Sequence, residues 1–328
     1  MTEVLIEASG LSKHYVRPAA RGQPGGVLRA ADGVSIDIRT GETLGLVGES
    51  GCGKSTLCRL LVRLVEPTAG TIRFNGQDLL NLRGRALKEA RRDLQFIFQD
   101  PYGSLDPRMT VRRIVGEGPK VHGLGSRSER DQAVLEMLAK VGLPDDAADR
   151  YPHEFSGGQR QRIGIARALV MRPRLVVADE PVSALDVSVQ AQILNQLADL
   201  KRDLSLTLVF VTHNLAAVGY LSDRVAVMYL GKIVEIVPTT SLFTEPMHPY
   251  TQALLSSVSG LGEDGTIARD RVVLSGELPS AVNPPSGCRF RTRCPIAQDV
   301  CAQTEPPLLE LVPGHKVACH FAGREAAA

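Results

Sequence analysis

Two hydrophobic patterns alternate along the 328-residue chain, and together they predict an α/β protein. Three short apolar runs are typical of strands buried on both faces, namely residues 42–47, 175–178 and 207–211. Leucines at helical spacing follow the first run, from Leu57 to Leu64, until Glu66 and Pro67 end the predicted helix. Strand and helix in this succession are the unit from which parallel sheets are built.

The regions beside this unit follow other patterns. Three segments near the N-terminus indicate strands, namely residues 4–6, 34–38 and 70–75. A Gly, Pro and Arg-rich stretch over residues 17–26 predicts a loop, and residues from about 84 to 160 are mostly helical. One helix there is expected to start at Ser128 and to bury Val134, Leu135, Leu138 and Val141. We therefore expect an antiparallel β portion and a helical subdomain beside the α/β core.

Composition and charge narrow the choice of partners. The net charge of +2 is too small to argue for nucleic acid, and the Arg-rich run over residues 83–92 is expected to be a solvated helix face. The chain starts without a charged and then apolar leader, and no apolar run approaches the roughly 18 residues of a spanning helix. We expect a soluble, cytoplasmic chain, whose six cysteines are thiols, metal ligands or bystanders rather than disulfides.

A glycine-rich turn of the form G-x-x-x-x-G-K-S follows the first buried strand. Its residues are Gly48, Glu49, Ser50, Gly51, Cys52, Gly53, Lys54, Ser55 and Thr56. The glycines let successive N–H groups point at one anion, and the next helix adds its positive N-terminal end. Lys54 is expected to reach the β and γ phosphates, and the Ser55 hydroxyl to bind Mg²⁺. A plain strand-to-helix turn is the alternative, and the flanking strand and helix favour the phosphate loop.

Polar residues follow the other two buried strands at the edge where α/β sheets place their ligands. Asp179 and Glu180 end the second strand. One carboxylate can hold Mg²⁺, and the adjacent one can orient and deprotonate an attacking water. His213 follows the third strand; a lone histidine is usually structural, but this position favours a γ-phosphate contact. Tyr15 is either a stacking partner for adenine or a partly packed surface residue.

Two loops add further candidates. Gln99 lies among turn formers, and its amide can donate and accept, which suits contact with Mg²⁺ or water. A second anion-binding helix start consists of Ser156, Gly157, Gly158 and Gln159. One domain has no need of two γ-phosphate sites. We therefore expect the second site to serve a nucleotide held by another subunit.

Taken together, these motifs resemble those of an ABC-type ATPase subunit, in the order in which that family carries them, over about residues 4–237. The correspondences are residues 48–56 with Walker A, Gln99 with the Q-loop, residues 156–159 with the signature, residues 175–180 with Walker B, residues 183–186 (ending in Asp186) with the D-loop, and His213 with the switch histidine. Residues 99–110, 151–154 and 248–251 are similar to the second, or F, ATPase subunit of oligopeptide/dipeptide importers. Asn214 and Asp106 depart from the usual Asp and Asn without touching the predicted chemistry.

The resemblance implies a P-loop NTPase core of ABC type that hydrolyses ATP to drive import of dipeptides or oligopeptides. ATP and Mg²⁺ are the implied cofactors, with Glu180 as base and His213 as γ-phosphate sensor. The implied partners are a second ATPase subunit in a heterodimer, two membrane-spanning permease subunits and, indirectly, an extracytoplasmic solute-binding protein. Such a chain sits on the cytoplasmic face of the inner membrane. The alternatives are import of nickel, glutathione or another solute, or a soluble ABC ATPase that acts on ribosomes or DNA.

The chain becomes Pro-rich after residue 237, so we expect an ATPase domain over residues 1–237 and a separate extension over residues 238–328. The extension contains Cys288, Cys294, Cys301 and Cys319. Four thiols suit an iron-sulfur cluster or zinc, although the C-x-x-C spacing of zinc ribbons is absent, and free thiols are the third possibility. The family resemblance implies a [4Fe-4S] cluster.

Overall fold

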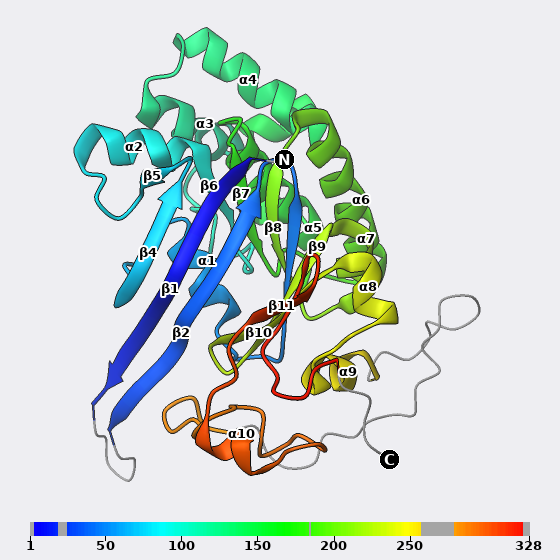
Figure 1. Cartoon of the computed structure of the whole chain (residues 1–328). Helices are drawn as coiled ribbons and strands as arrows, with labels where there is room; N and C mark the ends of the chain where they lie inside the picture. The colour runs from blue at the N-terminus through cyan, green and yellow to red at the C-terminus, as the bar shows by residue number, and fades with distance from the viewer. Residues whose placement is uncertain (1–2, 19–24, 184, 257–278, 324–328) are drawn as a thin grey trace.

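The strands that the apolar runs predict form the centre of one large sheet. The structure, a computed structural model, describes residues 3–18, 25–183, 185–256 and 279–323. The larger sheet has eight strands in the order β11-β12-β10-β9-β3-β8-β7-β6. Figure 1 shows β6, β7 and β8 of this sheet beside the helical part of the chain. The strands from β9 to β6 run parallel, and the other three add to them in antiparallel fashion. Their bounds are β3 (Thr43–Val47), β6 (Leu94–Ile97), β7 (Leu175–Asp179), β8 (Thr207–Val211), β9 (Arg224–Tyr229), β10 (Lys232–Pro238), β11 (Leu309–Val312) and β12 (His315–Val317).

A second, antiparallel sheet has the order β2-β1-β4-β5 and confirms the predicted β portion. Its strands are β1 (Val4–Arg17), β2 (Gly26–Arg39), β4 (Ala69–Phe74) and β5 (Gln77–Asp78). β1 and β2 are much longer than the predicted strands over residues 4–6 and 34–38. Their outer ends are largely exposed, so the apolar pattern fades there while backbone pairing continues as far as Arg17 and Gly26. The predicted loop therefore consists mostly of residues outside the described ranges.

Helix α1 (Lys54–Leu61) lies in the core between the two sheets. Leu57, Leu60 and Leu61 are buried there in one hydrophobic cluster with side chains from both sheets. The helix ends before Leu64, which was predicted to belong to it. Leu64 is half exposed and Arg63 adopts a left-handed φ of 52°, so the chain has already left the helix at that point.

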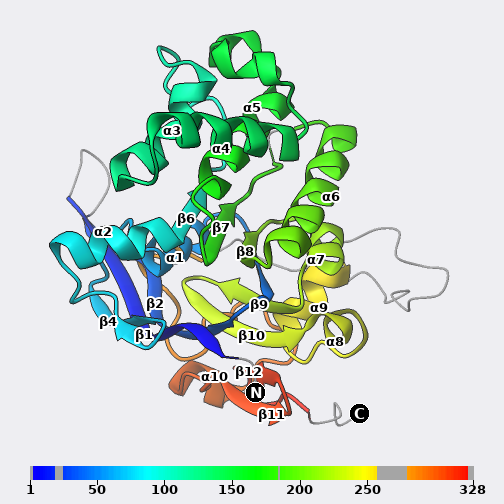
Figure 2. The same cartoon turned by 90° about the horizontal axis from the view of Figure 1, so that it is seen from above.

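The middle of the chain is helical, as predicted, apart from β6. Its helices are α2 (Gly84–Asp93), α3 (Val111–His122), α4 (Arg127–Lys140) and α5 (Gly157–Leu169), with short 3₁₀ turns at Asp145–Asp149 and Pro152–Glu154. Figure 2 places α3, α4 and α5 together, on the side of the molecule away from α10 and β11. The predicted start of α4 at Ser128 is wrong. Ser126 caps this helix, because its hydroxyl accepts the Glu129 N–H while the Glu129 carboxylate accepts the Ser126 N–H.

The rest of the chain returns to the large sheet. The remaining helices are α6 (Val187–Leu204), α7 (Leu215–Leu221), α8 (Thr239–Thr244), α9 (Pro249–Ser256) and α10 (Asp299–Gln303). β12 pairs with β10, so the predicted extension contributes strands to the same sheet as the predicted ATPase domain. The boundary at residue 237 stays a prediction. Within the described ranges, no helix is both long enough and apolar enough to cross a bilayer.

Candidate nucleotide-binding site

The glycine-rich turn connects β3 to α1 and forms a cradle that only glycine can build. Gly48 has a φ of 152° and Gly53 a φ of 108°. A Cβ on Gly48 would lie 2.1 Å from the Met228 carbonyl oxygen, and one on Gly53 would lie 1.8 Å from that of Ala30. The turn is therefore pressed against backbone from β2 and β9, and a side chain at either glycine would collide with it.

Lys54 is the first residue of α1 and is 5% exposed. Its ammonium donates to the carbonyl oxygens of Gly48, at 2.8 Å, and Glu49, at 3.1 Å. Ser50 and Gly51, by contrast, are exposed at the outer edge of the turn. Lys54 provides a cation, and the exposed edge of the turn and the start of α1 provide backbone N–H groups. Together these groups can bind one anion.

Ser55 and Asp179 lie together at the foot of the same turn. The Ser55 hydroxyl donates to Asp179 Oδ1 at 2.9 Å. Burial raises the pKa of Asp179, although the Ser55 hydrogen bond acts against this rise. A buried carboxylate beside a hydroxyl matches the oxygen donors that Mg²⁺ takes, and a cation there would offset the burial of the charge. These two residues therefore fit the predicted Mg²⁺ site.

Glu180 lies next to this pair and connects two other predicted residues. Gln99 Nε2 donates to Glu180 Oε2 at 2.9 Å, and His213 Nδ1 lies 3.8 Å from the same oxygen. Glu180 also adopts a left-handed φ of 46°, a conformation that costs energy for a residue other than glycine. The structure thus brings two residues, Gln99 after β6 and His213 after β8, to the carboxylate of Glu180 at the end of β7. Gln99 contacts Glu180 in this structure, and its predicted contact with Mg²⁺ stays a prediction.

The second glycine-rich helix start lies on α5. Ser156 caps this helix: its hydroxyl accepts the Gln159 N–H at 3.3 Å, and the Gln159 side chain accepts the Ser156 N–H at 3.0 Å. Ser156 and Gln159 are both exposed. Among the hydrogen bonds and ion pairs of the described residues, none joins residues 156–159 to residues 48–56. Asp186, the residue before α6, is also exposed and makes no side-chain cap.

Tyr15 lies near the outer end of β1, where it pairs with Leu28 of β2. Its ring is 37% exposed, and the Lys13 ammonium lies 5.3 Å from the ring centroid. The ring therefore has surface available for stacking, and its predicted contact with adenine stays a prediction.

Two residues that we did not assign to the site hold the phosphate loop from behind. The Tyr250 hydroxyl accepts the Glu49 N–H at 2.8 Å. Arg293 donates to both Glu49 carboxylate oxygens, at 2.9 and 3.1 Å. Tyr250 belongs to a stretch that carries the family resemblance, but nothing in that stretch indicates which residue it contacts. Arg293 has no sequence signal except that it precedes Cys294.

The four cysteines of the extension have the right chemistry for a cluster but not the arrangement. The pKa of Cys294 is raised to about 11, mainly by burial and in part by the neighbouring thiols Cys288, Cys319 and Cys301. The four thiols thus lie near one another. All six cysteines are nevertheless free, and the described residues contain no group of three or more His, Cys, Asp or Glu side chains placed to hold a metal ion. The predicted [4Fe-4S] cluster is therefore not supported by the side-chain positions.

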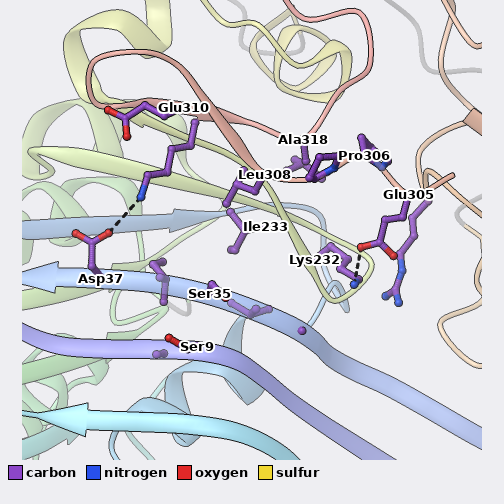
Figure 3. A pocket seen from close by; sticks show the side chains of 18 of the residues that line it. Ser9, Ser35, Asp37, Lys232, Ile233, Glu305, Pro306, Leu308, Glu310 and Ala318 are labelled. Carbon is purple, nitrogen blue, oxygen red and sulfur yellow. Dashed lines mark ion pairs between the residues drawn. The ribbon is translucent and has the colours of Figure 1, made fainter.

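A separate cavity of about 490 Å³ lies between β2, β10 and the extension (Figure 3). Ion pairs close two sides of it: Lys232 with Glu305, at 2.6 Å, and Lys316 with Asp37, at 3.7 Å. Ile233 and Leu308 line the space between them. None of the predicted nucleotide-binding residues lines this cavity, although Cys288 does, so it is distinct from the phosphate loop.

The cradle, the buried carboxylate and the Glu180 cluster lie at the carboxyl edge of a parallel sheet and define an ATPase of the P-loop class. Two families match the chain: ABC transporter, over residues 31–183, and Oligopeptide/dipeptide transporter, C-terminal region, over residues 234–301. The Oligopeptide transport ATP-binding protein AppF of Bacillus subtilis (strain 168) is 51% identical over 321 residues, which cover 97% of this chain and 98% of that protein. The chain therefore belongs to the ATP-binding subunits of ABC transporters and carries the oligopeptide/dipeptide transporter C-terminal region.

Solved structures support the fold. The ATP-binding cassette MJ0796, described as a dimer in a post-hydrolysis state bound to ADP and Pi, has a TM-score of 0.63 at 29% identity and covers 71% of this chain and 98% of that one. The cbiO1 protein from Clostridium perfringens, part of the ABC transporter complex cbiONQ, also has a TM-score of 0.63, at 26% identity, and covers 74% and 92%. Both likenesses confirm the predicted ABC-type α/β fold and leave part of this chain uncovered.

Proposed function

We propose that this chain hydrolyses ATP and that the hydrolysis powers import of dipeptides or oligopeptides through a membrane ABC transporter. The observation that carries the proposal is the alignment with an oligopeptide transport ATP-binding protein over 97% of this chain, extension included. Import of nickel or glutathione is the alternative within the same class. A soluble ABC ATPase acting on ribosomes or DNA is the alternative outside it.

The chemistry that we propose uses the residues gathered at the sheet edge. Glu180 accepts a proton from the attacking water, and Gln99 fixes the carboxylate by its hydrogen bond. Asp179 and Ser55 would hold Mg²⁺, with Gln99 as a further ligand, and the bound ion would shield phosphate charge. His213 contacts the γ phosphate from the exposed side of Glu180. Tyr15 stacks on adenine with its exposed ring face.

We propose further that two ATPase subunits, in a heterodimer, sandwich two ATP molecules. Each nucleotide would bind the phosphate loop of one subunit and the Ser156 to Gln159 turn of the other, with Asp186 at the same interface. The separation of these two turns within the chain, and the exposure of Ser156, support this arrangement. ATP then shifts the population towards the closed pair, because its γ phosphate contacts both halves, and hydrolysis reopens the pair.

The membrane partners would bind the helical subdomain. We propose that the loop after Gln99 and the helices around it receive a cytoplasmic helix from each of two permease subunits. Tyr102 in this loop supports the idea: it is 63% exposed, and the Arg160 guanidinium stacks 4.1 Å from its ring centroid. This arrangement places the chain on the cytoplasmic face of the inner membrane, and an extracytoplasmic solute-binding protein would deliver cargo to the permeases.

We retain the [4Fe-4S] cluster as a proposal for the four cysteines. The presence of four cysteines within the extension supports it, since a cluster of this type takes four thiolates. The segments that carry the cysteines would have to move to bring the thiols to one cluster. Iron and sulfide analysis after anaerobic purification tests the proposal. Stoichiometric zinc without iron would end it.

Uptake by a strain that lacks this gene tests the proposed function. We expect loss of uptake of a labelled dipeptide, a longer peptide, or both, with nickel uptake unchanged. Loss of nickel uptake alone would keep the ATPase and discard the peptide assignment. Complementation with Glu180→Gln separates chemistry from binding, since this variant should bind ATP yet leave uptake and turnover lost. Undiminished turnover would refute the assignment of Glu180 as base.

A further inference from the structure

Glu49, the second residue of the phosphate loop, is held by two side chains that lie far beyond the ATPase motifs. Arg293 forms a bidentate ion pair with its carboxylate, at 2.9 and 3.1 Å, and the Arg293 side chain is only 9% exposed. The Tyr250 hydroxyl accepts the Glu49 backbone N–H at 2.8 Å. The side chain and the backbone of this one loop residue are therefore both fixed by the C-terminal part of the chain.

The same residue fixes the catalytic lysine. The Glu49 carbonyl oxygen accepts a hydrogen bond from Lys54 Nζ at 3.1 Å, beside the Gly48 carbonyl at 2.8 Å. A shift of the Glu49 backbone would therefore move one of the two acceptors that hold the ammonium. Because Lys54 must be placed correctly to contact the phosphates, such a shift would weaken ATP binding.

The segments that carry Tyr250 and Arg293 are themselves held in place by packing and hydrogen bonds. Tyr250 is fully buried in an aromatic cluster with Tyr229 and Phe290, with ring centroids 4.7 to 5.4 Å apart. Arg289, four residues before Arg293, donates to the Leu230 carbonyl and to the Asp32 carboxylate. Packing and hydrogen bonds thus lock this part of the extension onto the core. Such support is what a precisely placed binding group requires.

We propose that Arg293 and Tyr250 are positioning residues for the ATPase reaction, which act through Glu49 to hold Lys54 at the phosphates. The extension then completes the nucleotide site of its own chain, in addition to any other role. This inference concerns ATP binding and is independent of the transported solute.

Equilibrium binding of ATP to the full-length chain tests the proposal. We expect Arg293→Ala to weaken ATP binding about tenfold, because a charge-assisted bidentate contact is lost. Arg291→Ala is the matched control: this arginine lies two residues away, and its hydrogen bonds go to Ser286 within the extension. It should leave ATP affinity unchanged. Equal affinity for ATP in the Arg293→Ala and wild-type chains would overturn the proposal.

Three further measurements distinguish positioning from general stability. Arg293→Lys should restore part of the affinity, since it keeps the charge and loses the bidentate fork. In ATPase assays KM should rise more than kcat falls, whereas loss of folded protein would lower the maximal rate alone. Arg293→Ala should add little in a Glu49→Ala background, and fully additive effects would refute action through Glu49.

Tyr250→Phe keeps the proposal testable if Arg293→Ala fails to fold. It removes only the hydroxyl that accepts the Glu49 N–H and leaves the aromatic cluster filled. We expect a weakening of ATP binding of a few-fold, about the effect of one hydrogen bond. Unchanged affinity in this folded variant would contradict the role of Tyr250.

Discussion

The chain has two glycine-rich turns that each lead into a helix, and they differ in how much of the molecule surrounds them. The turn before α1 touches Ala30 and Met228, receives the Gly231 N–H at the Cys52 carbonyl, and contacts Tyr250 and Arg293. The turn before α5 is capped by its own residues, and its serine is exposed. One turn is thus held by backbone and side chains from across the fold, whereas the hydrogen bonds that cap the other come from its own residues.

This difference indicates how much each turn depends on another chain to bind a nucleotide. The enclosed turn before α1 has Lys54, Asp179 and its supporting side chains within one chain. We therefore expect it to bind a nucleotide without a partner. The open turn has backbone N–H groups and an exposed serine, and no hydrogen bond or ion pair among the described residues joins it to the phosphate loop. It can contribute to a nucleotide site only together with groups from elsewhere, which is the arrangement proposed for the paired subunits.

The largest expected effect comes from breaking the enclosed turn. Lys54→Ala removes the buried ammonium, so ATP binding to the isolated full-length chain should fall on the order of 100-fold, as expected for charge-assisted contacts to phosphate. Equilibrium titration with ATP measures it. Lys88→Ala, on the exposed face of α2, is the control and should bind ATP normally. Wild-type affinity in Lys54→Ala would show that the nucleotide binds elsewhere.

The second prediction compares a glycine in each turn. Gly53→Ala would place a Cβ 1.8 Å from a backbone oxygen at a left-handed φ, so we expect a loss of about 3 kcal/mol in the free energy of unfolding. Gly158→Ala would place its Cβ 2.6 Å from the Val189 side chain, which can rotate, so we expect about 1 kcal/mol. Chemical denaturation of both variants gives the comparison. Equal losses would mean that the two turns are enclosed to the same degree.

Local sequence signals predicted both glycine-rich turns. Glycine spacing, the serine cap and the apolar strands are local signals, and they located the phosphate loop, Asp179, Glu180 and the start of α5. Motif order in a known family indicated Gln99 and His213 as site residues, but their positions beside Glu180 follow from the order of strands and were not predicted. The helical spacing of apolar residues also predicted the helical region, apart from the exact cap of α4.

The enclosure of the phosphate loop could not be predicted in the same way. Arg293 lies 244 positions from Glu49, and a single arginine among many carries no local signal for its partner. The long hairpin of β1 and β2 was missed because paired backbone needs no apolar pattern at exposed ends. The cysteines illustrate the opposite problem: their composition indicated a ligand set, whereas the side-chain positions do not assemble it.

The third prediction concerns pH. Acid should destabilise the packing around Tyr250, which holds the phosphate loop from behind. Burial lowers the pKa of His248 from 6.5 to about 4, against the attraction of Glu235, and its Nδ1 accepts the Tyr250 N–H. Between these two values the unfolded chain binds a proton that the folded chain excludes. Stability from this histidine is therefore complete above pH 6.5 and is lost as the pH falls towards 4, by up to about 3 kcal/mol.

The variant His248→Asn checks this assignment, because its amide oxygen can accept the Tyr250 N–H without titrating. Denaturant unfolding at several pH values should give a flatter profile between pH 6.5 and 4 than in the wild-type chain. Glu235 and His315 face the same buried site and remain in both proteins. His153→Asn, at an exposed position, is the control and should retain the wild-type profile. A profile of unchanged slope in His248→Asn would assign the acid sensitivity to other groups.

The smallest expected effect on stability, and the sharpest test of the open turn, is Ser156→Ala. Ser156 caps α5 and Ser126 caps α4 by the same reciprocal hydrogen bonds, and both are exposed. Each substitution to alanine should therefore cost about 1 kcal/mol in the free energy of unfolding. If the open turn completes a nucleotide site across subunits, only Ser156→Ala should also lower ATPase turnover of the assembled protein, while ATP affinity of the isolated chain stays unchanged. Equal turnover in the two variants would reduce Ser156 to a helix cap, and the difference between the two glycine-rich turns would then be one of packing alone.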